Sequence, residues 1–173
     1  MKGGRKIKRV FIFLLIIFLT GCSNIEVEVK EDLEKSFLVK RIKKYENNKV
    51  LGAYVVKNKT KEKILVQLIK SKGYKDYIYV LTFIDIKENK LKKVEVYKHK
   101  ETPAYGGYIE DDWFLKRFKN KDVNVKLKLV KMSANKENEI VAVTGATISS
   151  RSVIKGVNIS FDNYLEILKE ENK

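Results

Sequence analysis

Four segments between residues 51 and 97 are rich in β-branched and aromatic residues, which is the composition of β-strands. They cover residues 52–57, 63–69, 77–86 and 91–97. The residues Lys87-Glu88-Asn89-Lys90 between the last two segments are typical of a hairpin turn. Strands that follow one another with short connections predict a mostly antiparallel sheet.

The rest of the chain predicts helices and further strands around this sheet. A short helix is expected over residues 113–119, because Glu110-Asp111-Asp112 places carboxylates where a helix N-terminus favours them. Strands are expected at 123–132 and 139–143, and a terminal helix at 149–170, where apolar residues recur every four positions. The fold class is therefore α+β, with a few helices, and no internal repeat or second domain is expected.

Residues 23–50 are charged and have a weak helical spacing of apolar residues at Leu33, Phe37, Leu38 and Ile42. We interpret them as a tether that contains a short amphipathic helix. The predicted organisation is a leader at 1–21, a tether at 22–50 and one folded domain at 51–173. A chain of 173 residues with 44% hydrophobic residues is large enough for one domain with a real core.

The leader has a basic start, an apolar run from Val10 to Leu19 and then Thr20-Gly21-Cys22. Ten apolar residues are too few to span a bilayer, which requires about 20 in a helix, so the run is typical of a signal peptide. Leu19-Thr20-Gly21-Cys22 resembles the bacterial lipobox, which implies cleavage before Cys22 and lipidation of its thiol. The alternative is an accidental cysteine near an uncleaved anchor. We expect an extracytoplasmic protein that is lipid-anchored to a bacterial membrane.

Charge and cysteine content limit the possible functions. The formal net charge is +15, and removal of the five basic leader residues leaves +10. The lysines alternate with apolar residues, which indicates a solvated strand face, and no nucleic-acid partner is expected. If Cys22 is lipidated, no thiol remains for a disulfide, a metal site or nucleophilic catalysis. We predict no catalytic and no metal-binding residues.

Thr144-Gly145-Ala146-Thr147 lies where a predicted strand ends and the terminal helix begins. Free backbone N–H groups and the helix dipole make such a turn an anion site, and Gly145 permits close approach or a positive φ. A phosphate fits this position. The alternative is a plain helix start in which Ser149 or Ser150 is the N-cap.

Thr144-Gly145-Ala146-Thr147 followed by Ile148-Ser149-Ser150 resembles the flavinylation motif of the FMN-binding domain family. This family includes the G subunit of Rnf electron-transport complexes and the C subunit of sodium-translocating NADH:quinone reductases. The resemblance implies that a flavin transferase, using FAD, esterifies the phosphate of FMN to Thr147. It also implies that the backbone of 144–147 holds the phosphate.

A second segment, running from His99 through Glu101-Thr102-Pro103-Ala104-Tyr105-Gly106 to Gly107, is similar to a family loop that lies against the flavin ring. Its proline and paired glycines predict a loop. The resemblance implies hydrogen-bonding roles for Glu101 and Thr102 near the ring or the transferase. Tyr105 and Gly106 are expected beside the ring, with Tyr105 stacked on it. Gly73-Tyr74 matches the lead-in to this loop.

Two departures and one histidine complete the site prediction. Val141 stands where the family usually has an aspartate, with Glu139 as the nearest acid, and Ala104 replaces a glycine of the loop. A positive φ at Ala104 would be costly. His99 is the only histidine, and we interpret it as a partly exposed loop residue without a catalytic part, because no acidic partner can be assigned to it.

The predicted function is electron transfer by covalent FMN, with the chain acting as a component of an oxidoreductase system that passes electrons to and from partners in a membrane chain. A covalent bond would keep the cofactor from being lost outside the cytoplasm. The alternative is a noncatalytic basic lipoprotein that binds an anionic ligand or a cell-surface polyanion.

Overall fold

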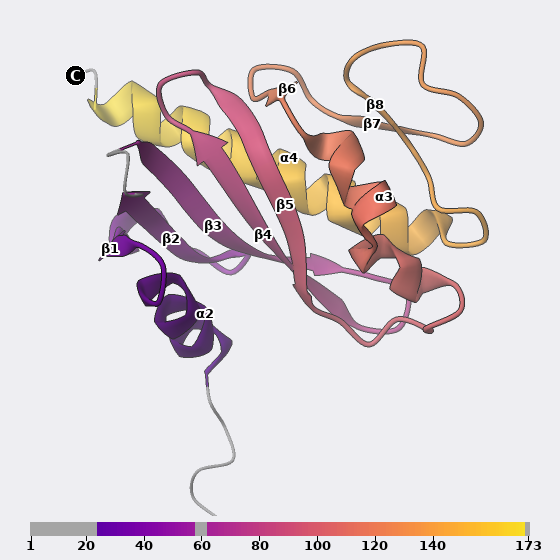
Figure 1. Ribbon diagram of the computed structural model, residues 1–173, viewed down its shortest axis with the longest axis horizontal. Coiled ribbons are helices and arrows are strands. Elements are labelled where there is room, and N and C mark those ends of the chain that lie inside the picture. Colours follow the sequence, from indigo (N-terminus) through magenta and orange to yellow (C-terminus); the bar gives the residue numbers. More distant parts are fainter. Residues whose placement is uncertain (1–23, 58–61, 172–173) are drawn as a thin grey trace, which may run out of the picture.

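The computed structural model describes residues 24–57 and 62–171, so the predicted leader and Cys22 lie outside the described residues. Its centre is a six-stranded sheet in which every neighbouring pair is antiparallel and the strand order follows the sequence (Figure 1). The strands are β1 (Leu38–Arg41), β2 (Val50–Lys57), β3 (Lys63–Lys72), β4 (Tyr77–Asp85), β5 (Lys90–Lys98) and β6 (Lys121–Asp122). The predicted antiparallel sheet and the hairpin turn between β4 and β5 are confirmed.

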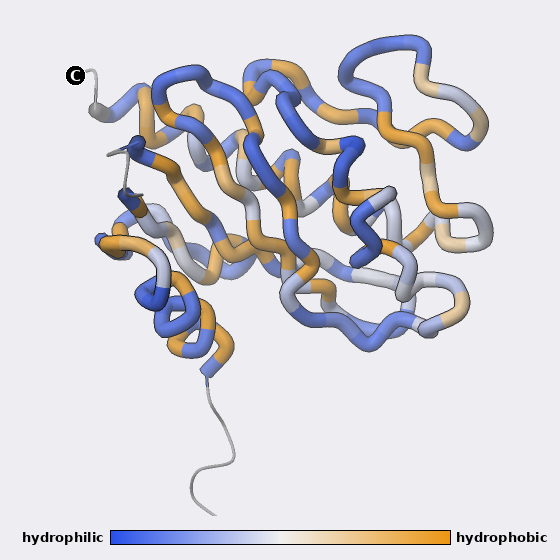
Figure 2. The backbone as a smooth tube through the Cα atoms, viewed as in Figure 1, coloured by the Kyte–Doolittle hydropathy of each residue, from blue (hydrophilic) through white to orange (hydrophobic). Residues whose placement is uncertain are grey.

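The terminal helix α4 (Thr147–Glu171) lies across one face of the sheet (Figure 1). Side chains alternate along β3 and β4, so every second residue points to α4 and the others to the opposite face. Both faces bury apolar residues, so the two strands are hydrophobic along most of their length (Figure 2). Val153, Val157 and Phe161 of α4 are fully buried against this face. The predicted spacing of four residues is therefore the buried stripe of the helix.

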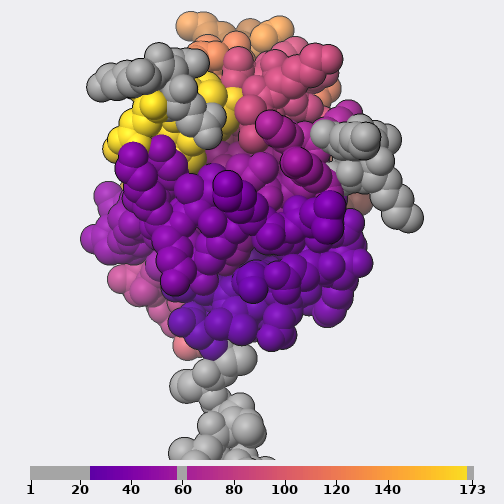
Figure 3. Space-filling model, turned by 90° about the vertical axis from the view of Figure 1, so that its left-hand side faces the viewer, coloured from indigo at the N-terminus to yellow at the C-terminus, as the bar shows by residue number. Residues whose placement is uncertain are grey.

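The helix α2 (Ile25–Glu34) packs on the other side, where Val29 and Leu33 meet Tyr54, Val56 and other residues of a second, smaller core. Figure 3 shows α2 and the strands that follow it, in indigo and purple, forming one side of the molecule. Among the helices of the described residues, none has the length and apolar character that crossing a bilayer requires.

The segment predicted as a tether differs from the expectation. The helix ends at Glu34, and Leu38–Arg41 form β1, paired with β2 in the register Leu38 to Lys57. The helix predicted from the apolar spacing at Leu33, Phe37, Leu38 and Ile42 is therefore wrong beyond the first of these residues. The edge of β2 supplies backbone hydrogen bonds to this segment, and such tertiary pairing overrides a weak helical pattern.

The region after the sheet is more irregular than predicted. The 3₁₀-helix η2 (Gly106–Glu110), α3 (Asp112–Leu115) and η3 (Lys116–Phe118) follow the loop, so the predicted irregular structure ends at Tyr105 and the short helix is split. β7 (Lys128–Val130) and β8 (Glu139–Val141) form a separate parallel pair. The strand predicted at 123–132 is wrong in its first half, because the side chain of Asn158 on α4 bonds both backbone groups of Leu127.

Candidate functional site

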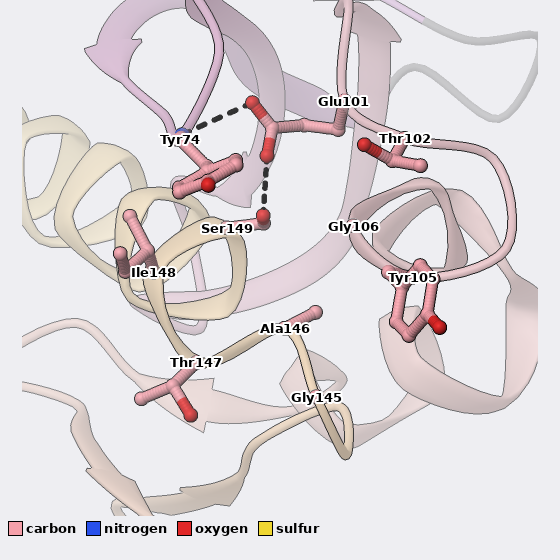
Figure 4. A pocket seen from close by; sticks show the side chains of 10 residues that line it. All are labelled: Tyr74, Glu101, Thr102, Tyr105, Gly106, Gly145, Ala146, Thr147, Ile148 and Ser149. Atoms are coloured by element: carbon pink, nitrogen blue, oxygen red, sulfur yellow. Dashed lines mark hydrogen bonds between the residues drawn. The ribbon is translucent and has the colours of Figure 1, made fainter.

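The predicted motifs meet at the N-terminal end of α4, around a hollow of about 490 Å³ (Figure 4). Three segments far apart in the chain surround it: the turn between β3 and β4, the loop after β5, and the start of α4. Its lining residues are Tyr74, Glu101, Thr102, Tyr105, Gly106, Gly145, Ala146, Thr147, Ile148 and Ser149. A hollow of this size is in the range of small-molecule and cofactor sites.

Thr147 is the first residue of α4, two positions earlier than predicted. Within the described chain, the backbone N–H groups of Thr147, Ile148 and Ser149 meet no acceptor. Free N–H groups at the start of a 25-residue helix form an anion site. Gly145 has a φ of +75°, so the expected positive φ is present in the turn that precedes the helix.

The plain helix start with a serine N-cap is wrong, because both serines lie inside the helix and bond elsewhere. The Ser150 hydroxyl accepts from the backbone N–H of Val143 at 3.0 Å, which closes the connection from β8. The Ser149 hydroxyl donates to the carboxylate of Glu101. The residue before the helix is Ala146, which has no polar side chain, so these first N–H groups remain available.

Glu101 is buried, with 4% of its surface exposed, and its carboxylate joins the three segments. One oxygen accepts from the backbone N–H groups of Tyr74 and Lys75, each at 3.0 Å, and the other accepts from Ser149 (Figure 4). Three donors satisfy a buried carboxylate that would otherwise be costly to desolvate. Glu101 therefore holds the hollow together.

Two glycines allow this close packing around Glu101. A Cβ placed on Gly73 would lie 2.6 Å from an oxygen of Glu101, and one on Gly106 would lie 2.8 Å from the hydroxyl of Ser149. Both distances are shorter than side chains tolerate, so the two positions require glycine for steric reasons. The close approach of Glu101 and Ser149 thus explains why Gly73 and Gly106 are glycines in this chain.

Two aromatic side chains border the hollow. Tyr74 and Tyr105 are 66% and 60% exposed, although each carries a large aromatic ring. Tyr105 lies over the turn, since a Cβ on Gly145 would be 3.4 Å from its ring. An exposed aromatic ring beside a cavity is available to pack against a planar ligand.

The structure decides two points about the loop. The residues with positive φ in the described chain are Asn89, Asn120 and Gly145, so Ala104 carries no such strain. His99 does have an acidic partner, because its Nε2 lies 3.0 Å from the carboxylate of Glu110. Its Nδ1 accepts from the backbone N–H of Glu101, which places the proton of the neutral ring on Nε2. His99 thus orients the loop at Glu101.

A surface ion pair also ties the loop to the β3–β4 turn. Lys100 lies 2.9 Å from Asp76, and this hydrogen bond, followed by one from the backbone N–H of Tyr77, holds the pKa of Asp76 below its usual value. The side chain of Asp76 is 39% exposed, so solvent screens the pair. It adds to the positioning of the loop more than to stability.

The position that lacks the usual acid lies at the end of β8. The carbonyl of Val141 accepts from Arg117 at 2.5 Å. The carboxylate of Glu139 bonds the backbone N–H groups of Asn135 and Lys136, so it closes a turn and does not replace the missing acid. Among the described residues, no group of three or more acidic, histidine or cysteine side chains is placed to hold a metal ion.

Seven of the eight predicted cofactor-binding residues line the hollow, and Thr144 does not, since it lies exposed in the preceding turn. The prediction omitted Tyr74, Ile148 and Ser149. Ile148 and Ser149 would have followed from starting the helix at Thr147. The sequence matches Gly73-Tyr74 to the lead-in of the loop, but nothing in the sequence places this β3–β4 turn beside α4.

The model of the FMN-binding domain family matches residues 73–162, which is more than half of the chain. The chain belongs to the FMN-binding domain family. The matched range contains every residue that lines the hollow, whereas α2, β1 and β2 precede it. Family membership confirms the resemblance and supports the predicted FMN cofactor.

Two relatives belong to membrane oxidoreductases. The chain is 36% identical over 113 residues to the G subunit of the proton-translocating ferredoxin:NAD(+) oxidoreductase complex of Clostridium ljungdahlii, covering 64% of this chain and 60% of the relative. It is 30% identical over 148 residues to the G subunit of the Na(+)-translocating ferredoxin:NAD(+) oxidoreductase complex of Acetobacterium woodii, covering 85% and 63%. The chain thus spans less than two thirds of the length of these relatives.

Solved structures show the same fold. NqrC from Shewanella oneidensis superposes with a TM-score of 0.59 at 22% identity, covering 79% of this chain and 70% of that one. The C subunit of the Na(+)-translocating NADH-quinone reductase from Parabacteroides distasonis has a TM-score of 0.64 at 17% identity, covering 85% and 84%. These likenesses confirm the α+β fold class.

Proposed function

We propose that the chain is an electron-transfer flavoprotein that carries FMN as a phosphoester on Thr147 and is held at the outer surface of a bacterial membrane through Cys22. The observation that carries the proposal is the position of Thr147. It is the first residue of α4, it borders the hollow, and it lies beside N–H groups that meet no acceptor in the described chain.

The residues of the hollow fit the two ends of FMN. The free N–H groups at residues 147–149 suit a phosphate, because the helix dipole favours negative charge there. The exposed Tyr105 and the polar side chain of Thr102 come from the loop, Tyr74 comes from the β3–β4 turn, and together they suit the planar ring. Glu101 is engaged by three donors, so its role is to position these groups.

Attachment requires a flavin transferase and FAD. The hydroxyl oxygen of Thr147 forms a bond to the FMN phosphorus, the pyrophosphate bond of FAD breaks, AMP leaves, and the hydroxyl proton is released. When bound, FMN supplies one- and two-electron redox chemistry, and the protein supplies position and environment. Val141 leaves this step without the usual acid, so the free N–H groups are the main support for the phosphate.

The relatives suggest the setting. Both are named as G subunits of ferredoxin:NAD(+) oxidoreductase complexes, and we infer that this chain likewise exchanges electrons with protein partners at a membrane. The predicted lipid anchor at Cys22 would keep it there. Incorporation of a clickable fatty acid tests the anchor, and label that persists in Cys22→Ser refutes it.

Direct flavin fluorescence of a denaturing gel tests covalent attachment. The full chain is co-expressed with a flavin transferase, and a fluorescent band is expected for the wild type and for Thr144→Ala, but not for Thr147→Ala. Thr144 is the matched control, because it is a threonine of the same motif that does not border the hollow. A band in Thr147→Ala, or none in the wild type, overturns the proposal; the second result favours a noncatalytic lipoprotein that binds an anionic ligand.

A further inference from the structure

A second hollow, of about 380 Å³, is lined by several basic residues. It is lined by Asn48, Lys49, Lys70, Ser71, Lys72, Tyr77, Lys155 and Ile159. Four of these eight residues are lysines, and they come from three different parts of the chain: the residue before β2, the end of β3 and the middle of α4. The fold therefore gathers positive charge that is dispersed in the sequence.

These lysines have no acidic partner within 4 Å among the described residues. Asp76, whose carboxylate feels the charge of Lys72, is paired with Lys100 at 2.9 Å. The ammonium groups of Lys70 and Lys72 lie 4.1 and 5.2 Å from the centre of the same ring, that of Tyr77. Two like charges held at one ring repel each other, and an external anion would relieve that repulsion.

Two segments of the chain, α4 and the end of β3 with its turn, contribute residues both to this basic hollow and to the hollow of the candidate site, called the flavin hollow below. On α4, the residues Ile148, Arg151 and Lys155 follow one another at helical spacing and are all exposed, so they form one stripe. Ile148 borders the flavin hollow and Lys155 borders the basic one. On the sheet, Lys72 and Tyr74 are two residues apart and border one hollow each.

The resulting surface has an apolar centre and a basic rim. Tyr74 and Ile148, at the flavin hollow, are 66% and 49% exposed. Arg151 and Lys155 follow Ile148 on α4, and Lys72 lies two residues before Tyr74 at the end of β3. An exposed aromatic and aliphatic centre with a charged rim is the anatomy of a protein interface, and charge at the rim raises the rate of encounter.

We propose that this surface docks the acidic face of a redox partner protein and brings that partner to the flavin. This proposal rests on the proposed function, because a flavin in the hollow is the reason for a redox partner to dock at this place. A protein partner is favoured over an anionic bilayer, because a membrane lying on the stripe of α4 would cover Tyr74 and Ile148 and close the flavin hollow. An acidic protein uses the same charges and still reaches the cofactor.

The test compares two triple variants of the flavin-loaded full chain that carry the same change in charge. One is Lys72→Glu, Arg151→Glu and Lys155→Glu at the proposed surface. The matched control is Lys57→Glu, Lys63→Glu and Lys90→Glu, three exposed lysines at the other end of the sheet. β3 spans Lys63–Lys72, so the two sets are separated by about 30 Å at 3.3 Å per residue.

The reduced flavin is mixed with one of two oxidants of opposite charge, acidic plastocyanin and basic cytochrome c, at several salt concentrations. In the surface triple, oxidation by plastocyanin is expected to slow by about tenfold or more at low salt and to lose its salt dependence, while oxidation by cytochrome c accelerates. The control triple should change either rate much less. Equal effects of the two triples, or no effect of the first, overturn the proposal.

Two further measurements separate the remaining outcomes. Flavin absorbance is measured before any oxidant is added, so a chain without flavin overturns the proposed function and this proposal with it. Unchanged rates in a flavin-loaded chain overturn docking alone. The full chain is also reconstituted in phosphatidylcholine vesicles with and without phosphatidylserine. If phosphatidylserine slows flavin oxidation in the wild type but not in the surface triple, the basic surface binds a bilayer and the docking proposal is overturned.

Discussion

The two faces of the sheet are held by different chemistry. On the α4 face, neutral groups form a buried network in which the Gln67 amide donates to Ser160, the Ser160 hydroxyl meets Thr82 at 2.6 Å, and Asn163 donates to Gln67. On the α2 face, the polar contacts around the apolar core involve charged groups. Arg41 bonds Glu26 and Glu46, Asp85 bonds Lys92, and Asp32 accepts from Tyr97.

This difference separates the part of the fold that builds the site from the part that surrounds it. The hollow of the candidate site depends on where α4 begins, and the α4 face holds the buried middle of that helix by packing and by neutral hydrogen bonds, which do not change with pH or salt. The helix α2 and the strands β1 and β2 lie outside the range that the family model matches, and so does β3, which both faces share. The charged contacts of the α2 face are more exposed, so they respond to pH and salt.

The largest expected effect follows from removing one apolar side chain from each face. Phe161 on α4 is fully buried, and Phe161→Ala should lower the free energy of unfolding by about 3–5 kcal/mol. Leu33 on α2 is 6% exposed, and Leu33→Ala should cost about 2–3 kcal/mol, the low end for leucine, because an edge helix can shift into the space. Urea unfolding measures both.

Native-state hydrogen exchange sharpens this first prediction. Leu33→Ala should raise exchange mainly in α2 and β1, whereas Phe161→Ala should raise it in α4 and throughout β3 and β4. Equal and global acceleration in both variants would mean that the two faces unfold as one unit and that the proposed division is wrong.

An intermediate effect is expected at the point where α4 meets the loop. Glu101→Ala leaves two backbone N–H groups and the Ser149 hydroxyl without their acceptor, and should cost about 2–4 kcal/mol. Glu101→Gln keeps an amide oxygen for the backbone donors and an NH₂ group for the serine, so it should cost less than about 1 kcal/mol. Thermal unfolding compares the two variants.

The same pair of variants also tests whether Glu101 only positions its neighbours or takes part in the chemistry of flavin attachment. Flavin attachment, measured by gel fluorescence, should fall in Glu101→Ala and persist in Glu101→Gln. If Glu101→Gln unfolds like the wild type and yet carries no flavin, the carboxylate acts in attachment and is more than a positioning group.

The smallest effect is acid sensitivity on the α2 face. Burial acts to raise the pKa of Asp85, but hydrogen bonds from Lys92 and from the backbone of the next turn outweigh it, so the pKa lies below its usual value. A lowered pKa means that the stabilisation is present above the unfolded value of about 3.9 and is lost as pH falls through the folded value. Asp85→Asn should cost about 1–3 kcal/mol at pH 7, and this difference should shrink below about pH 4.

Urea unfolding between pH 3 and pH 7 measures the effect of Asp85→Asn. A substitution on the α4 face serves as the control, because Asn163→Ala removes a neutral group and its cost should not vary with pH. A cost of Asp85→Asn that stays constant down to pH 3 would contradict the charged character assigned to the α2 face.

The strands of the sheet were predictable because each is a local pattern. The four segments between residues 51 and 97 and the turn between β4 and β5 were placed nearly as they are found. β1 and the first half of the strand predicted at 123–132 were not, since their structure depends on partners distant in sequence. β1 requires the edge of β2, and residue 127 bonds the side chain of Asn158.

The candidate site was predictable as two motifs but not as one place. The sequence by itself determined an antiparallel sheet, a terminal helix and two segments that match one family, because these depend on spacing along the chain. Only the tertiary structure decided that Glu101 bridges Tyr74 and Ser149, that α4 begins at Thr147, and that basic residues gather at a second hollow. Such contacts join residues far apart in sequence, and local patterns carry no information about which distant partners they meet.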